Sequence, residues 1–500
     1  MTVIDTLADG SATSPSTVQG TARRAFGWSL LNSVAGRFAT VVVGLILARL
    51  LAPAEYGTFA VAILVLAILQ SMNELGVSVA VIQWPGDVRR AAHTATTLAL
   101  GTSVLLYVVV YAVAPSIAGA IGAPESTLVI RVLALGVLID GVSSIPGALM
   151  TRVFQQRRRA VADLVALVPS SVVSVVLAVQ GHGAMSLAYG SLAGNLTATA
   201  LVLLLAPARP LPGWQRDDAV ALLRVGLPLA GTSLVLLATM NVDYVVVGRQ
   251  LGTTALGLYL LAFNLSSWPS NLLSIAVRRV AIPGFARLAD ERAELEQAFA
   301  KSLRALSVAG FLLAAPLAAL ASVVLGVVYG ARWTPAGSAL AALAILGGLR
   351  IVFDLAYDLL AGVGRSRSLL GVQLGWFGGL LVALPIGASI GGIGGVAIAH
   401  VVVAVTLVGP LYLMALSHAG LSVRRVLSAL APAAMASLGC VAVIAVGGEL
   451  GFAGLPAVVV LGGAGALAYA LSLVAHPSTR PMLVALWMRT PARTLLSGRG

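Results

Sequence analysis

The sequence ARLLAPAEYGTF, Ala48–Phe59, returns about two hundred residues later as GRQLGTTALGLY, Gly248–Tyr259. Each copy joins one long apolar stretch to the next. The positions that recur without a gap are Arg49 and Arg249, Leu51 and Leu251, Gly57 and Gly257, and the aromatic pair Phe59 and Tyr259. A repeat at equivalent points of two hydrophobic halves predicts a membrane transporter with two lobes.

Composition excludes a soluble protein, because 59% of the 500 residues are hydrophobic, only 10% are charged, and the mean hydropathy is +0.99. A bilayer core about 30 Å thick needs roughly 20 apolar residues per helix. The chain holds about fourteen such stretches. We therefore predict an all-α polytopic membrane protein with about 14 transmembrane helices, arranged as two parallel six-helix lobes around a central cavity plus two C-terminal helices.

The predicted boundaries follow the apolar stretches and the polar segments between them. They are a disordered cytoplasmic tail at 1–25, an N-lobe at 26–206, a cytoplasmic linker at 207–218, a C-lobe at 219–416, helices 13 and 14 at 417–475, and a second cytoplasmic tail at 476–500.

The basic residues indicate the orientation. With both termini inside, most of the 31 Lys and Arg residues fall in cytoplasmic segments, as expected for a protein of the cell inner (plasma) membrane. The net charge of +13 therefore reflects topology, and no nucleic-acid partner is predicted. Topology alone also accounts for the run QQRRR, Gln155–Arg159, although this run could attract an anionic lipid or a lipid-linked phosphate as well.

The sequence lacks the motifs that several other functions require. Lys301 is the only lysine and follows Ala300, so no nucleotide-binding loop with a Gly-Lys pair exists. Cys440 is the only cysteine, which excludes an intramolecular disulfide and a cysteine-cluster metal site. The five histidines show no metal-ligand spacing. The predicted outside loops are short, unlike those expected of polymerases and ligases that act on lipid-linked sugars. We predict no enzyme activity, no cofactor and no metal.

Polar stripes inside the apolar stretches should face the protein interior, because a charge facing lipid costs about 2.5 to 3.5 kcal/mol on insertion scales. The sharpest stripe lies on the tenth span at helical spacing: Arg350, Phe353, Asp354, Tyr357 and Asp358.

Other spans repeat the pattern. The first places Arg37 in mid-membrane without an acid on its own helix; the remaining stripes are Thr232, Thr239 and Asp243 on the seventh span, Asn264, Ser267, Asn271 and Ser274 on the eighth, and Gln70, Asn73 and Glu74 on the second. Ordinary helix packing also uses small and hydroxyl residues. Arg350 and Asp354 could be a neutralising pair, and Asp358 and Glu74 could be solvated at the cytoplasmic end. Arg131 and Asp140 lie on opposite faces of their helix, so no shared cavity role follows for them.

The chain resembles the polysaccharide flippases of the multidrug/oligosaccharidyl-lipid/polysaccharide exporter superfamily. The resemblance rests on ARLLAPAEYGTFAVA with NELGVSVAVIQ, Asn73–Gln83, on NVDYVVVGRQLGTTALGLYLLAFNL, Asn241–Leu265, and on VRRVAIPGFARLADE, Val277–Glu291. It implies alternating access, a cavity lined by helices one, two, seven and eight, and a polyprenyl-diphosphate-linked oligosaccharide carried outward during cell-surface polysaccharide biosynthesis.

The same resemblance suggests the site residues. Candidate substrate-binding residues are Arg37, Arg350, Asn264, Asn271 and Tyr357, and candidate ion-coupling residues are Asp243, Asp354, Asp358 and Glu74. The expected partners are the lipid-linked glycan and the lipid bilayer, with a polysaccharide polymerase or glycosyltransferases as candidate protein partners. Two other functions stay open: cation-coupled multidrug efflux, as in the related branch, and a scaffold without transport in a glycan-synthesis complex.

Overall fold

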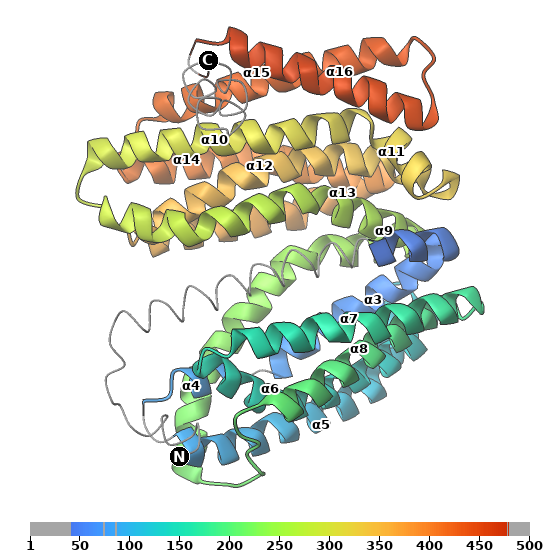
Figure 1. The fold of residues 1–500 in the computed structure, drawn as a ribbon, viewed down its shortest axis with the longest axis vertical. Helices are drawn as coiled ribbons and strands as arrows, with labels where there is room; N and C mark the ends of the chain where they lie inside the picture. The colour runs from blue at the N-terminus through green and yellow to red at the C-terminus, as the bar shows by residue number, and fades with distance from the viewer. Residues whose placement is uncertain (1–41, 74–75, 86–87, 478, 480–500) are drawn as a thin grey trace, which may run out of the picture. The chain divides into compact units, whose positions relative to one another are not determined.

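The computed structural model describes residues 42–73, 76–85, 88–477 and 479, with side chains described outside 228–236, 238–240 and 269–280. Within this part of the chain every regular element is helical, and eleven stretches are long and apolar enough to cross a membrane (Figure 1). One stretch, Ser366–His418, has the length of two crossings. The prediction of an all-α polytopic protein is confirmed. The count of fourteen stays a prediction, and most of the expected first span lies outside the described residues.

The chain divides into two compact units, Met1–Gly257 and Leu258–Gly500. The helices of the first unit are α3 Pro53–Asn73, α4 Val77–Ile82, α5 Val88–Ala120, η1 Pro124–Ser126, α6 Thr127–Arg152, α7 Gln156–Val179 and α8 Ala184–Leu205. They are followed by the long α9, Arg216–Arg287, which is interrupted at Gly252 and continues into the second unit. In the first unit α7 packs against α8, and α6 packs against α5 and α8 (Figure 1).

Both copies of the repeated sequence form the same break between helices. α3 starts at Pro53, and the backbone of α9 leaves the helical region at Gly252, where φ is 84°. The aligned glycines of the two copies meet within the first unit. A Cβ on Gly57 would lie 1.7 Å from the Thr253 carbonyl oxygen, and one on Gly257 would lie 1.8 Å from that of Pro53. Only glycine permits this reciprocal approach of two helix starts.

Two groups of hydrogen bonds position the short α4 and the segment after α8. Arg152, at the end of α6, donates to the carbonyl oxygens of Val81, Ile82 and Trp84 at 2.8–3.1 Å, which satisfies the last acceptors of α4. The segment at 207–215 lies along the start of α5, where the Thr97 hydroxyl donates to the Gly213 carbonyl at 2.7 Å. These contacts add to apolar burial, because Val77, Ala80 and Val81 of α4 lie in a hydrophobic cluster with α5 and α6, and Ala208 packs against it.

The second unit contains α10 Arg292–Ala319, α11 Ala321–Val328, η2 Ala331–Ala336, α12 Gly337–Gly362, α13 Ser366–Val403, η3 Ala404–Val408, α14 Gly409–His418, α15 Val423–Gly448 and α16 Gly454–Ala475. Non-helical angles at Gly391 and Gly392 break α13, which splits its long apolar run into two crossings. α10 packs against α12 and α15, and α15 against α16 (Figure 1).

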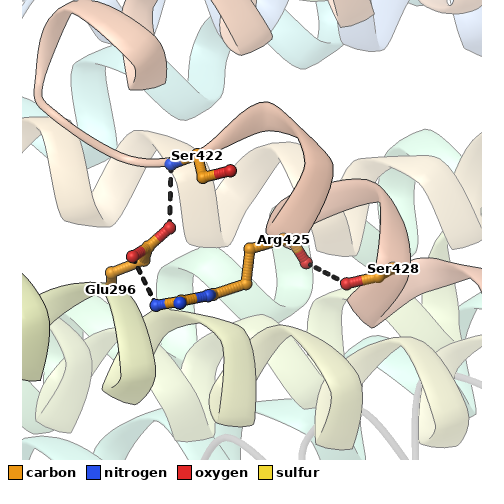
Figure 2. A network of polar contacts seen from close by, with 4 residues as sticks. All are labelled: Glu296, Ser422, Arg425 and Ser428. Atoms are coloured by element: carbon orange, nitrogen blue, oxygen red, sulfur yellow. Dashed lines mark hydrogen bonds and ion pairs between the residues drawn. The ribbon is translucent and has the colours of Figure 1, made fainter.

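The last two helices are fastened to α10 at two depths. Inside the bundle, the buried Tyr469 of α16 donates its hydroxyl to the Val308 carbonyl at 2.9 Å. At the start of α15, the Glu296 carboxylate accepts from the Ser422 amide at 2.8 Å and pairs with Arg425 (Figure 2). The C-terminal pair is therefore an integral part of the second unit.

Candidate functional site

A polar cavity of about 450 Å³ lies inside the first unit, between membrane-spanning helices. Its polar lining comes from α3, α4, α6, α7 and α8: Gln70, Asn73, Ser78, Asp140, Ser143, Ser144, Arg159, Asp163, Asn195 and Thr199. A cavity of this volume holds several waters or a hydrated cation, since one water needs only about 10–15 Å³.

Asp140 is the acidic centre of this cavity. Its carboxylate is half-buried and accepts a hydrogen bond of 2.9 Å from the side-chain amide of Gln70, and it also interacts with Asn195. Both amides therefore reach the carboxylate from other helices, α3 and α8, so three helices meet at one oxygen-rich point.

Hydroxyls and a third side-chain amide continue the polar lining. Asn73 is buried; its side chain accepts from Ser103 at 2.6 Å and donates to the Val137 carbonyl. The hydroxyls of Ser78 and Ser144 lie 2.7 Å apart, and Thr199 donates to Ser143 at 3.1 Å. Carboxylate, amide and hydroxyl oxygens are the ligands that hard cations prefer, and the same groups can relay a proton.

The corresponding helix of the second unit carries the predicted charged stripe. On α12, Phe353 and Asp358 are buried, while Arg350, Asp354 and Tyr357 are half-buried, so the whole stripe is at least partly inside the protein. The Arg350 guanidinium lies 5.3 Å from the centre of the Phe263 ring, within cation–π distance.

An aromatic cluster backs this stripe. The Phe353 ring stacks on Tyr412 with centroids 5.4 Å apart, and it meets Trp376 edge to face at 5.7 Å. Such a cluster fixes one side of α12 and leaves the charged groups on a rigid helix.

The remaining predicted residues are distributed differently. Asp243 is buried in the first unit, where one carboxylate oxygen accepts from the Tyr244 amide at 3.0 Å. Asn264 is exposed in the second unit. Arg37, Glu74 and the side chain of Asn271 lie outside the described residues. The structure thus brings Arg350, Asp354, Tyr357 and Asp358 together on α12, and their roles stay predictions.

The sequence interpretation missed the cavity around Asp140. A signal was available, because Asp140, Ser143, Ser144 and Gly147 follow the i, i+3, i+4, i+7 spacing of a single helix face. Considering Asp140 only with Arg131 obscured that stripe. In the structure Arg131 instead donates to the Tyr111 carbonyl and lies over the Tyr111 ring.

Comparison with known proteins gives the family. Residues 46–338 match the family described as "Polysaccharide biosynthesis protein". The chain belongs to this family. It is a multi-spanning membrane protein of polysaccharide biosynthesis, and the match confirms the family resemblance seen in the sequence.

Similar proteins include the succinoglycan biosynthesis transport protein ExoT of Rhizobium meliloti, 27% identical over 350 residues that cover 70% of this chain and 71% of ExoT. The teichuronic acid biosynthesis protein TuaB of Bacillus subtilis is 26% identical and covers 59% of this chain and 62% of TuaB. The lipopolysaccharide biosynthesis protein WzxC of Escherichia coli is 23% identical, with 65% and 66% covered.

Among solved structures, the fold is similar to that of the lipid II flippase MurJ in an inward closed conformation, with a TM-score of 0.73, 14% identity, and 89% of this chain and 98% of MurJ covered. It is also similar to an inward-facing multidrug resistance MATE family transporter, with a TM-score of 0.60, 19% identity, and 76% and 94% covered. At these identities the likeness concerns the fold alone.

Proposed function

We propose that this protein is a flippase that moves a polyprenyl-diphosphate-linked oligosaccharide from the cytoplasmic to the outer face of the cell membrane by alternating access. The observation that carries the proposal is the α12 stripe, where the Arg350 guanidinium lies over an aromatic ring inside a membrane helix bundle. A half-buried cation next to aromatic surface suits a cargo that combines a diphosphate with sugar rings.

Arg350 binds the diphosphate in this mechanism, and Tyr357 lies one to two turns along the same helix for contact with the sugar. Arg37 and Asn271 complete the substrate-binding set, together with Asn264. The lipid tail stays in the bilayer, so only the polar head has to cross through the protein.

Two sources of energy are available to the transport cycle. Outward movement of two negative charges through an inside-negative potential releases about 4.6 kcal/mol per 100 mV, at about 2.3 kcal/mol per charge. A cation that binds one conformation more tightly than the other would add to this bias. The Asp140 cavity offers the oxygen ligands for such a cation, and Asp354 and Asp358 are the second candidates, with Asp243 and Glu74 as further ones.

The test replaces Arg350 and follows the lipid-linked glycan. Cells with Arg350→Ala should accumulate the glycan on the cytoplasmic face and lose most surface polysaccharide, whereas Arg350→Lys should retain part of the export because it keeps the charge. A charge-assisted contact of about 1.5–3 kcal/mol corresponds to a loss of roughly 10- to 150-fold.

The matched control is Arg367→Ala, which removes an exposed arginine from the first turn of α13 and should leave export unchanged. Cationic-drug efflux that survives Arg350→Ala, with normal surface polysaccharide, would favour the multidrug alternative. Normal insertion with unchanged export in Arg350→Ala would exclude this residue from cargo binding.

A further inference from the structure

The turn after α6 in the first unit and the turn after α12 in the second have the same backbone form. They differ in the residue at their left-handed position. α6 ends at Arg152 and α7 begins at Gln156; α12 ends at Gly362 and α13 begins at Ser366. In the first turn Phe154 donates to the Thr151 carbonyl and Gln155 to that of Met150. In the second, the corresponding donors are Gly364, to Ala361, and Arg365, to Leu360.

The left-handed position of this turn holds Phe154 in the first unit and Gly364 in the second, with φ of 56° and 73°. Glycine adopts this region without strain, whereas a bulky side chain there is an outlier. Among the described residues Phe154 is the only residue other than glycine with positive φ. The residue is 54% exposed, so packing inside this protein does not account for the choice of phenylalanine.

The residues that follow Phe154 add a second unfavourable feature. Arg157, Arg158 and Arg159 occupy the first turn of α7, which contains no acidic residue, and all three are exposed. Positive charges are disfavoured at the positive end of the helix dipole, and anions are favoured there. The corresponding turn of α13 keeps only Arg367, followed by Ser368 and Leu369.

The position of the turn indicates which kind of partner would favour both the exposed phenylalanine and the arginines that follow it. It connects two candidate membrane spans, so it lies at the level of the lipid headgroups. An exposed aromatic ring is favourable at that depth, and guanidinium groups there bind lipid phosphates.

We propose that Phe154, Arg157 and Arg158 form a docking site for anionic phospholipid headgroups at the predicted cytoplasmic end of α6 and α7. The ring inserts between the acyl chains and the headgroups, and the two guanidinium groups contact the phosphate. Arg158 is held towards the end of α8 by contact with the Leu205 carbonyl at 3.3 Å. The site is separate from cargo transport and does not depend on the identity of the glycan.

The experiment measures which lipids the full-length purified protein retains in native mass spectrometry, with phosphatidylglycerol and phosphatidylcholine offered in equal amounts. The wild-type protein should retain phosphatidylglycerol preferentially. Arg157→Gln with Arg158→Gln should lower this preference by about fivefold per arginine, and the preference should weaken as ionic strength rises. Phe154→Gly should reduce retention by about threefold or more through loss of apolar insertion.

Two controls keep the result specific. Phe154→Gly places the residue of the sister turn at a position whose backbone suits glycine, so loss of lipid cannot come from a distorted turn. Arg367→Gln removes an arginine at the matching position of α13 and should leave the preference unchanged. An unchanged preference in the double arginine variant or unchanged lipid retention in Phe154→Gly would overturn the site, and so would an equal loss of preference in Arg367→Gln.

Discussion

α6 and α12 occupy matching places in the two units, since each leads into the same turn, yet at one matching position they carry opposite charges. Asp140 of α6 and Arg350 of α12 occupy the same position in the two helices when residues are counted back from Phe154 and Gly364. The acid contacts Gln70 in a cavity, and the arginine lies over an aromatic ring. The two halves therefore share a scaffold and differ in the chemistry that the scaffold holds.

The neighbouring positions explain why the α6 face borders a cavity. Ser143 and Gly147 of α6 are small and leave space beside Asp140. Their counterparts on α12 are Phe353 and Tyr357, and the Phe353 ring fills its surroundings with Trp376 and Tyr412. Side-chain volume at equivalent positions thus decides whether a polar cavity or a packed aromatic cluster forms.

Substitution of the two aligned glycines should disrupt the shared scaffold, and we expect it to cause the largest loss of stability. Gly57→Leu and Gly257→Leu each place a side chain against a backbone carbonyl that cannot move independently of its helix. We expect each variant to lose about 3 kcal/mol or more of stability, at the upper end of overpacking penalties. Thermal unfolding and the yield of folded protein in detergent measure this loss.

Gly44→Leu is the matched control, because no atom of the described residues lies within 4 Å of the position its Cβ would take. The contact is reciprocal, so the two variants should be damaged to a similar degree. Strong destabilisation of one with a neutral effect of the other would show that the two copies do not meet symmetrically.

The opposite charges lead to a second prediction of intermediate size. If Asp140 supports ion coupling, Asp140→Asn should reduce gradient-driven export by about 5- to 150-fold, the usual range of coupling between sites. Its fold should be preserved, because the amide oxygen still accepts from Gln70. Arg350→Gln should instead reduce export with or without an ion gradient, since it weakens cargo binding. Glycan transport in proteoliposomes with and without an imposed gradient separates the two effects.

The double variant Asp140→Asn with Arg350→Gln sharpens the assignment. Independent steps predict that the two losses multiply. A double variant no worse than the more damaged single variant would mean that both charges serve one step. Full gradient dependence in Asp140→Asn would exclude that residue as the coupling site and return attention to Asp354 and Asp358.

Much of this architecture is readable from the sequence because the bilayer restricts the choice. Apolar length predicts the helices, and the repeat Ala48–Phe59 with Gly248–Tyr259 predicts two related halves. The α12 stripe was also predictable, since its charges share one helix face. The contact of Gly57 with Gly257 was not, because periodicity does not say which helices approach each other. The Asp140 cavity was harder still to predict, since the side chains that contact Asp140 come from α3 and α8, which lie far apart along the chain.

The smallest expected effect concerns the turn that differs between the units. A left-handed conformation costs a side chain roughly 1–2 kcal/mol, and glycine gives back part of this through the greater freedom of its unfolded chain. Phe154→Gly should therefore stabilise the protein by about 1 kcal/mol or less in detergent, and Gly364→Phe should destabilise it by a similar amount. Thermal unfolding of the two single variants and of the double variant checks this, and the double variant should be about as stable as the wild type.

Adding anionic lipid should turn the stabilisation by Phe154→Gly into destabilisation, and should do so at this turn alone, because only there does the ring gain a partner that offsets the strained backbone. A stabilised Phe154→Gly in both detergent and phosphatidylglycerol would mean that the ring has no such partner, and the difference between the turns would then carry no function.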